Sequence, residues 1–180
     1  MNLWHDISRG KKAPEEINTI VETPKGSSNK YEIDKDTGLI ALDRANYTSA
    51  PYPFDYGFIP QTLWDDDDPF DVLILTTFPL TPGVLVKIRP VALMEMVDDG
   101  DSDYKIIGVP AKDRRFEDIK DLEDLNKHQL KEYKHFFETY KDLKEKDVEV
   151  KVHGYKNKEE AVEAFNRSVK LYEEKFGKTE

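Results

Sequence analysis

The chain has 180 residues, a mass of 20.9 kDa, a formal net charge of −10 and a pI near 5.0. This acidic balance argues against nucleic acid or an anionic membrane as a partner, because binding to such surfaces needs an excess of Lys and Arg. The absence of cysteine excludes disulfides, a thiol nucleophile and a cysteine zinc site.

The length suits a single domain over residues 1–180, and no linker-like or low-complexity stretch predicts a second one. The first residues lack the apolar core of a signal peptide. No segment approaches the roughly 18 apolar residues of a membrane span. We therefore expect a cytoplasmic protein without a membrane partner.

Strand signals dominate the chain up to Pro110. They predict a strand at 17–22, a hairpin of 31–34 and 39–43, a buried strand at 72–76, a long strand at 84–97 interrupted at Pro90, and a strand at 104–109. Several short strands separated by turns are typical of a small closed or partly closed barrel.

Helical periodicity replaces this pattern in the last third of the chain. Apolar residues recur at helical spacing over 127–143 and again from Lys158 onward, with an alternating strand at 148–152 between them. Together these elements predict an α+β fold, a barrel with helices packed against it. The aromatic stripe around Phe136 could face either the core or another subunit, which periodicity cannot distinguish.

Residues 65–71 hold five carboxylates at the start of an apolar run. Two like charges about 4 Å apart repel by roughly 4 kcal/mol at an effective dielectric near 20, so such a cluster needs cations or protons. Hard divalent ions prefer carboxylate oxygen. In an extended segment Asp66 and Asp68 point to one side, and Asp71 opens the next strand. These three carboxylates could converge on a magnesium site, the alternative being a solvated acidic loop.

A second acidic turn, residues 98–103, joins two of the predicted strands. Neither cluster is an EF-hand, because no register gives Gly at the sixth position together with Glu at the twelfth. Two carboxylate turns suit the binding of two or more ions about 3.5–4 Å apart, the arrangement of phosphoryl-transfer sites. The alternative is an ordinary hydrophilic hairpin loop.

Side chains that could bind phosphate accompany these acids. Arg offers a planar fork of donors, Lys a point charge and Tyr a neutral donor. The candidates are Lys30, Arg44, Tyr52, Tyr56, Tyr140 and Lys141. Each also has an ordinary structural interpretation, as a solvent-facing strand end, a turn-packing ring or a helix end.

Residues 66–72 match the signature D-[SGDN]-D-[PE]-x-D, followed by an apolar residue, of the soluble family I inorganic pyrophosphatases. Further blocks resemble the same family in the same order, from about Pro14 to the final helix: Glu22 with Lys30-Tyr31-Glu32, Asp43-Arg44, Tyr52 with Tyr56-Gly57, Asp98 with Asp103 and Lys105, and His135 to Lys141. The chain length is similar to that of the short prokaryotic branch.

The resemblance implies an OB-like five-stranded β-barrel with flanking α-helices. It implies hydrolysis of inorganic pyrophosphate to two phosphates by direct attack of a metal-bridged water, and a homohexamer. Several Mg²⁺ ions would serve each active site, with Mn²⁺ or Zn²⁺ as possible substitutes. We expect Ca²⁺ to inhibit, because its longer and looser coordination would misplace the water.

By the matching positions, the resemblance also assigns roles. The metal ligands would be Asp66, Asp71, Asp98 and Asp103, with Glu32 helping through water. The substrate-binding residues would be Lys30, Arg44, Lys105, Tyr140 and Lys141, with Tyr52 supporting the site and Glu22 lining the cavity. Asp68 would be the general base and Tyr56 would lie near the leaving group. The remaining acids, Asp65, Asp67, Asp99 and Asp101, are expected to be solvated.

Two alternatives remain open on the sequence. One is a catalytically silent OB-type module that holds structural cations. The other is a hydrolase of a related polyphosphate, such as a nucleoside triphosphate.

Overall fold

The computed structural model describes residues 1–145 and 148–178. Its strands are β1 (Ile17–Thr23), β2 (Asn29–Ile33), β3 (Ile40–Ala45), β4 (Asp55–Phe58), β5 (Asp71–Ile74), β6 (Leu85–Asp98), β7 (Asp101–Ser102), β8 (Lys105–Pro110) and β9 (Val150–Lys156). Its helices are α1 (Lys127–Thr139) and α2 (Lys158–Phe176), preceded by two short 3₁₀ turns at Arg114–Phe116 and Leu122–Asp124.

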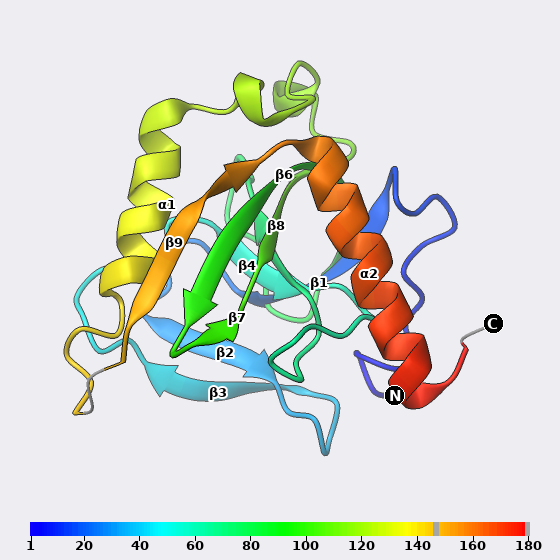
Figure 1. The fold of residues 1–180 in the computed structure, drawn as a ribbon, viewed down its shortest axis with the longest axis horizontal. Coiled ribbons are helices and arrows are strands. Elements are labelled where there is room, and N and C mark those ends of the chain that lie inside the picture. Colours follow the sequence, from blue (N-terminus) through cyan, green and yellow to red (C-terminus); the bar gives the residue numbers. More distant parts are fainter. Residues whose placement is uncertain (146–147, 179–180) are drawn as a thin grey trace.

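Five strands form a closed ring in the order β1-β4-β5-β8-β6, and β6 pairs again with β1. All these pairings are antiparallel except that of β5 with β8. β7 and β9 extend the sheet by pairing with β6, while β2 and β3 form a separate hairpin beside the barrel (Figure 1). The predicted five-stranded barrel and α+β class are confirmed.

Besides the short strand β7 and the two 3₁₀ turns, which were not predicted, the structure differs from the sequence-based elements at β4 and at Pro90. β4 was not predicted, because its four residues are all buried and show no polar–apolar alternation. The predicted break at Pro90 is wrong, since β6 runs through it. A register shift between Pro90 and Ala92 accommodates the missing N–H within the ladder.

A close strand approach explains the glycine of the Tyr56-Gly57 block. A Cβ atom at Gly57 would lie 2.0 Å from the carbonyl oxygen of Ile20 on the neighbouring strand. Any side chain there would force β1 and β4 apart. The barrel therefore closes tightly beside Tyr56, one of the candidate site residues.

The two helices cover different parts of the barrel (Figure 1). α1 places Tyr133, Phe136 and Phe137 in a core cluster with Tyr52 and Phe54, so the aromatic stripe packs within the chain. α2 packs against β6, with Ala161, Ala164 and Phe165 in a second cluster. Within residues 1–145 and 148–178, neither helix is long and apolar enough to cross a membrane.

Candidate active site

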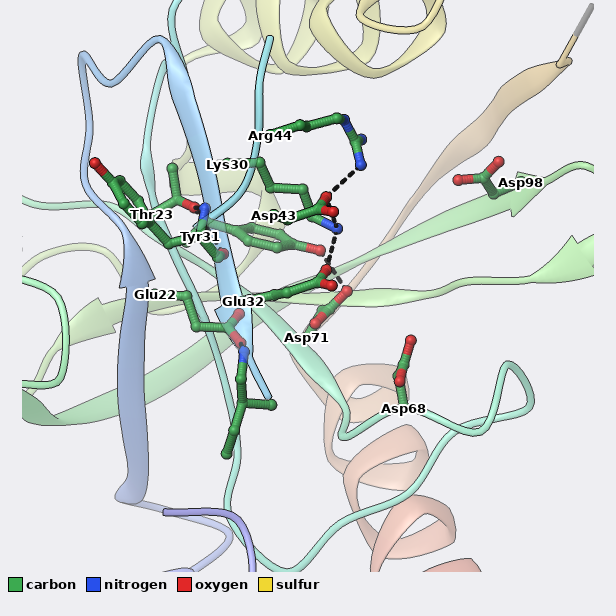
Figure 2. Close-up of polar contacts among 12 residues, drawn as sticks. Glu22, Thr23, Lys30, Tyr31, Glu32, Asp43, Arg44, Asp68, Asp71 and Asp98 are labelled. Carbon is green, nitrogen blue, oxygen red and sulfur yellow. Dashed lines mark hydrogen bonds and ion pairs between the residues drawn. The ribbon is translucent and has the colours of Figure 1, made fainter. Parts of the chain in front are cut away.

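One cavity of about 330 Å³ collects side chains from the loop before β5, the turn after β6, the hairpin β2–β3 and the end of α1. Its aspartates outnumber its cations. The polar and charged lining residues are Lys30, Arg44, Tyr52, Tyr56, Asp66, Asp68, Asp71, Asp98, Asp99, Asp101, Asp103, Lys105, Tyr140 and Lys141. Figure 2 shows Asp68, Asp71 and Asp98 around a common space, together with Lys30 and Arg44.

Two of the predicted site residues, Glu22 and Glu32, lie next to this cavity rather than in its lining. They line an adjoining pocket of about 170 Å³, whose walls also include Lys30, Asp68 and Asp71. All the other residues predicted to bind metal or substrate line the main cavity. The structure therefore brings together residues more than a hundred positions apart.

The aspartate loop, residues 65–68, is a tight turn and not the extended segment that we expected. The Trp64 N–H donates to the Asp68 carbonyl at 2.8 Å, and the Asp67 N–H donates to the Trp64 carbonyl at 3.1 Å. Asp67 has φ of 66°, the left-handed conformation that Asp and Asn tolerate better than most residues. Asp66 and Asp68 nevertheless both line the cavity, while the Asp67 side chain is 74% exposed.

Carboxylates expected to be free in solvent instead fix this loop to other elements. Asp65 accepts two hydrogen bonds from Arg167 of α2, at 2.6 and 3.2 Å, and Asp67 pairs with Lys175 at 2.8 Å. We expected both side chains to be solvated, and they are 35% and 74% exposed, but the sequence did not predict their ion pairs. Their partners lie about a hundred residues away, so no local pattern could reveal them.

Lys105 is the central cation of the site, and its side chain is only 2% exposed. Its ammonium lies 2.7 Å from an Asp103 oxygen and 2.8 Å from an Asp71 oxygen. Burial opposes its charge, but these two carboxylates raise the pKa of Lys105 above its usual value. The parallel register that aligns Asp71 with Lys105 places this pair side by side. The Lys105 ammonium thus bridges two of the predicted metal ligands, Asp71 and Asp103.

One ammonium does not balance the carboxylates around it. Burial, then the charges of Asp71 and Asp103, raise the pKa of Asp66 to about 7. Burial likewise raises the pKa of Asp103 despite its pairing with Lys105. Both shifts come first from burial and then from neighbouring carboxylates, and a divalent ion bound to these oxygens would favour their charged forms.

The donor atoms fit a hard divalent ion, because the cavity offers carboxylate oxygens and no thiolate or imidazole. Among the described residues, however, no three His, Cys, Asp or Glu side chains are arranged so that they could hold one ion together. Asp71 and Asp103 are engaged by Lys105 instead. An ion at these oxygens would therefore take over part of the Lys105 pairing.

The remaining cations are held in place by neighbouring carboxylates, and the nearest to Lys30 is Glu32 of the same strand, at 2.5 Å. Lys30 lies 3.4 Å from Asp43, which also accepts a hydrogen bond from Arg44 (Figure 2). Lys141 pairs with Asp98, and the Tyr140 hydroxyl lies 3.5 Å from the same carboxylate. These pairs orient donors toward the cavity before any anion arrives.

Neutral groups complete the site. The Tyr56 hydroxyl donates to Asp71, and burial raises the pKa of Tyr56 well above its usual value. Burial also raises the pKa of Tyr52 to about 12 and that of Glu22 well above its usual value. Glu22 accepts from the Ile33 N–H at 2.7 Å. At neutral pH the two tyrosines act as hydrogen-bonding partners and add no negative charge, while burial disfavours the charged form of Glu22.

Sequence reasoning missed several residues with contacts in the site. Lys35, in the β2–β3 turn, forms an ion pair with Asp68 and donates to the Asp67 carbonyl at 3.2 Å. Asp43 was noted only beside Arg44, although it contacts two cations. Asp99 and Asp101, expected to be bystanders, are exposed but line the cavity. Only the adjacency of Asp43 to Arg44 was visible in the sequence.

Comparison with known proteins places this site in a family. The chain matches the sequence model described as inorganic pyrophosphatase over residues 19–173. It is 48% identical over 176 residues to an inorganic pyrophosphatase of Haloferax volcanii, covering 98% of this chain and 99% of the relative. Soluble inorganic pyrophosphatase 1 of Arabidopsis thaliana is 45% identical over 171 residues, covering 95% of this chain and 80% of the relative.

A solved structure agrees with these sequence matches. The crystal structure of inorganic pyrophosphatase from Thermus thermophilus superposes with a TM-score of 0.92 at 45% identity, covering 96% of this chain and 99% of that chain. The likeness extends over the whole barrel and its helices. This chain therefore belongs to the inorganic pyrophosphatase family.

Proposed function

We propose that this chain hydrolyses inorganic pyrophosphate to two phosphates in this cavity, with divalent metal ions, chiefly Mg²⁺, as cofactors. The observation that carries the proposal is the composition of the cavity, in which excess carboxylates face Lys30, Arg44 and Lys141. Such a cavity offers ligands for cations and donors for phosphate within one space. The family membership points to the same reaction.

Asp66, Asp71 and Asp103 are the residues that would hold the tightest ion, with Asp98 for further ions and Glu32 acting through water. When bound, divalent ions neutralise phosphate oxygens and make water more acidic. Tyr56 holds the Asp71 carboxylate in place through its hydroxyl. Mn²⁺ and Zn²⁺ are oxygen-binding divalent ions that we propose as weaker substitutes.

The substrate is a compact polyanion, and an acidic protein must present it with local positive charge. Lys30, Arg44, Lys105 and Lys141 supply that charge, while Tyr140 donates a hydrogen bond without adding charge. Tyr52 packs against Phe136 beneath the site at a ring distance of 4.8 Å. Glu22 lines the adjoining pocket, and burial there raises its pKa and so disfavours its charged form.

We assign Asp68 as the general base that accepts a proton from the attacking water. It lines both the main cavity and the adjoining pocket, and its side chain is 49% exposed, so it can reach substrate-bound solvent. Lys35 forms an ion pair with this carboxylate, which fixes its position at the edge of the cavity. Direct attack by water needs no covalent intermediate, and the cavity lining, which has no Cys, Ser or His, fits that route.

The two alternative functions make different demands. A silent cation-binding module would not need phosphate donors on the walls that face the carboxylates. A hydrolase of longer polyphosphates would need room for the remainder of the substrate. We also propose that residues 1–180 act as one catalytic domain in the cytoplasm, without a nucleic-acid partner, which the charge of −10 supports.

Phosphate release from pyrophosphate tests the proposal directly. We expect release with Mg²⁺, none with EDTA, and much slower release from ATP offered at the same concentration. Replacing Mg²⁺ by Ca²⁺ should lower turnover by roughly 10²-fold, because displacing a reacting atom by about 1 Å has an effect of that size. If pyrophosphate releases no phosphate in Mg²⁺, the proposed function is wrong.

Replacing Asp68 by Asn should lower turnover by roughly 10²–10⁴-fold, the usual contribution of a general base. The shape of the side chain is kept and only the proton acceptor is lost, so folding and Mg²⁺ affinity should change little. Turnover is measured at saturating Mg²⁺ and pyrophosphate, with circular dichroism to verify the fold.

Asp67→Asn is the matched control for this substitution. It removes one negative charge from the same loop, and Asn tolerates the left-handed conformation of residue 67. Because the Asp67 side chain is exposed and points to Lys175, turnover should stay within about twofold. Equal losses in the two variants would show that the loop acts only through its total charge.

We further propose a homohexamer. Exposed apolar side chains support an assembly, since Leu39 and Leu42 of the β2–β3 hairpin are each 60% exposed and Phe78 is 68% exposed. Light scattering at micromolar concentration should therefore report a mass larger than that of a dimer. A monomer under these conditions would contradict this part of the proposal.

A further inference from the structure

Trp64 lies outside the cavity lining, yet it contacts residues next in sequence to three of the predicted metal ligands. Its side chain belongs to a buried cluster and is 5% exposed. The indole stacks on Phe70 at 4.3 Å between ring centroids and lies 5.6 Å from the ring of Tyr104. Its Nε1–H donates to the Ser102 hydroxyl at 3.2 Å.

These partners are the sequence neighbours of the carboxylates. Phe70 immediately precedes Asp71, while Ser102 and Tyr104 flank Asp103. The Trp64 backbone closes the turn that carries Asp66, through its contacts with residues 67 and 68. One residue thus touches the chain next to each of the three carboxylates that would hold the tightest ion.

The position of Trp64 is itself fixed from outside. The guanidinium of Arg167 lies 4.5 Å over the indole ring, and the same guanidinium holds Asp65 with two hydrogen bonds. The indole is therefore enclosed between α2 and Phe70, with little freedom to tilt. The ring lies between the loop before β5 and the turn after β6 and contacts both.

We propose that Trp64 is a positioning residue for the metal site, and that it sets the spacing of Asp66, Asp71 and Asp103 and hence the affinity for Mg²⁺. The inference rests on the proposed function, since these carboxylates are assigned as ligands there. Residues that orient metal ligands without touching the ion typically change metal affinity by about 10–100-fold when replaced. Trp64 should behave in this way, with little effect on turnover at saturating Mg²⁺.

The test compares Trp64→Phe and Trp64→Leu with the wild type in two measurements. The first is the Mg²⁺ concentration at half-maximal phosphate release. The second is the binding midpoint for Mg²⁺ obtained by fitting the rise in unfolding temperature with Mg²⁺ concentration in the absence of substrate, which needs no activity. We expect both midpoints to rise, by roughly tenfold in Trp64→Leu and by less in Trp64→Phe, which keeps an aromatic ring.

Trp4→Phe and Trp4→Leu are the matched controls. Trp4 is equally buried, at 3% exposure, and its Nε1–H donates to the Thr62 carbonyl at 2.8 Å, but it belongs to a different core cluster. These variants should lower the unfolding temperature equally with and without Mg²⁺ and leave the Mg²⁺ midpoints unchanged. A change of midpoint in the Trp4 variants equal to that in the Trp64 variants would overturn the proposal.

Ser102→Ala isolates the link between the two turns without disturbing the buried rings. It removes only the acceptor of the indole N–H, so it should shift the Mg²⁺ midpoints in the same direction as Trp64→Phe, and the double variant should be no weaker than Trp64→Phe alone. Unchanged midpoints in Ser102→Ala and both Trp64 variants, in a wild type that hydrolyses pyrophosphate, would refute the role of Trp64. A wild type that releases no phosphate would instead refute the proposed function. In that case, a higher Mg²⁺ midpoint for the unfolding temperature in the Trp64 variants would still support the role of Trp64 in positioning the metal ligands.

Discussion

Crowding of carboxylates around a buried ammonium is the constraint on which this site depends. Lys105 offsets Asp71 and Asp103, but Asp66 remains close enough that burial and its acidic neighbours raise its pKa to about 7. Like charges at such distances are stable only with protons or cations nearby. The metal-free protein therefore holds an excess of negative charge that Mg²⁺ and a polyanionic substrate can together bring into balance.

The barrel makes this crowding possible. The parallel pairing of β5 with β8 sets Asp71 beside Lys105, and the antiparallel turn after β6 returns Asp103 to the same place. Ion pairs from α2 and from the β2–β3 turn then hold the aspartate loop against this edge. Each exposed pair contributes little to stability, so we interpret them as constraints on loop geometry.

Most of the fold and most of the residues of the candidate site were predictable from the sequence. Alternation and helical spacing revealed most strands and both helices, and the family blocks identified most of the side chains that line the cavity. β4 escaped because a fully buried strand of four residues has no alternation. The roles of Lys35 and Arg167 escaped because ion pairs between distant elements leave no local pattern. The turn at Asp67 escaped because an Asp run is compatible with both extended and left-handed backbone.

Calorimetric titration of the metal-free protein with MgCl₂, in the absence of substrate, tests most directly whether the carboxylates require a divalent ion. NaCl at matched ionic strength is the control for screening of exposed charges. We predict saturable heat with at least one Mg²⁺ bound per chain, and no saturable heat with NaCl. Heats that stay unsaturated and equal for the two salts would contradict the account, because the carboxylates would then be balanced by the protein's own cations.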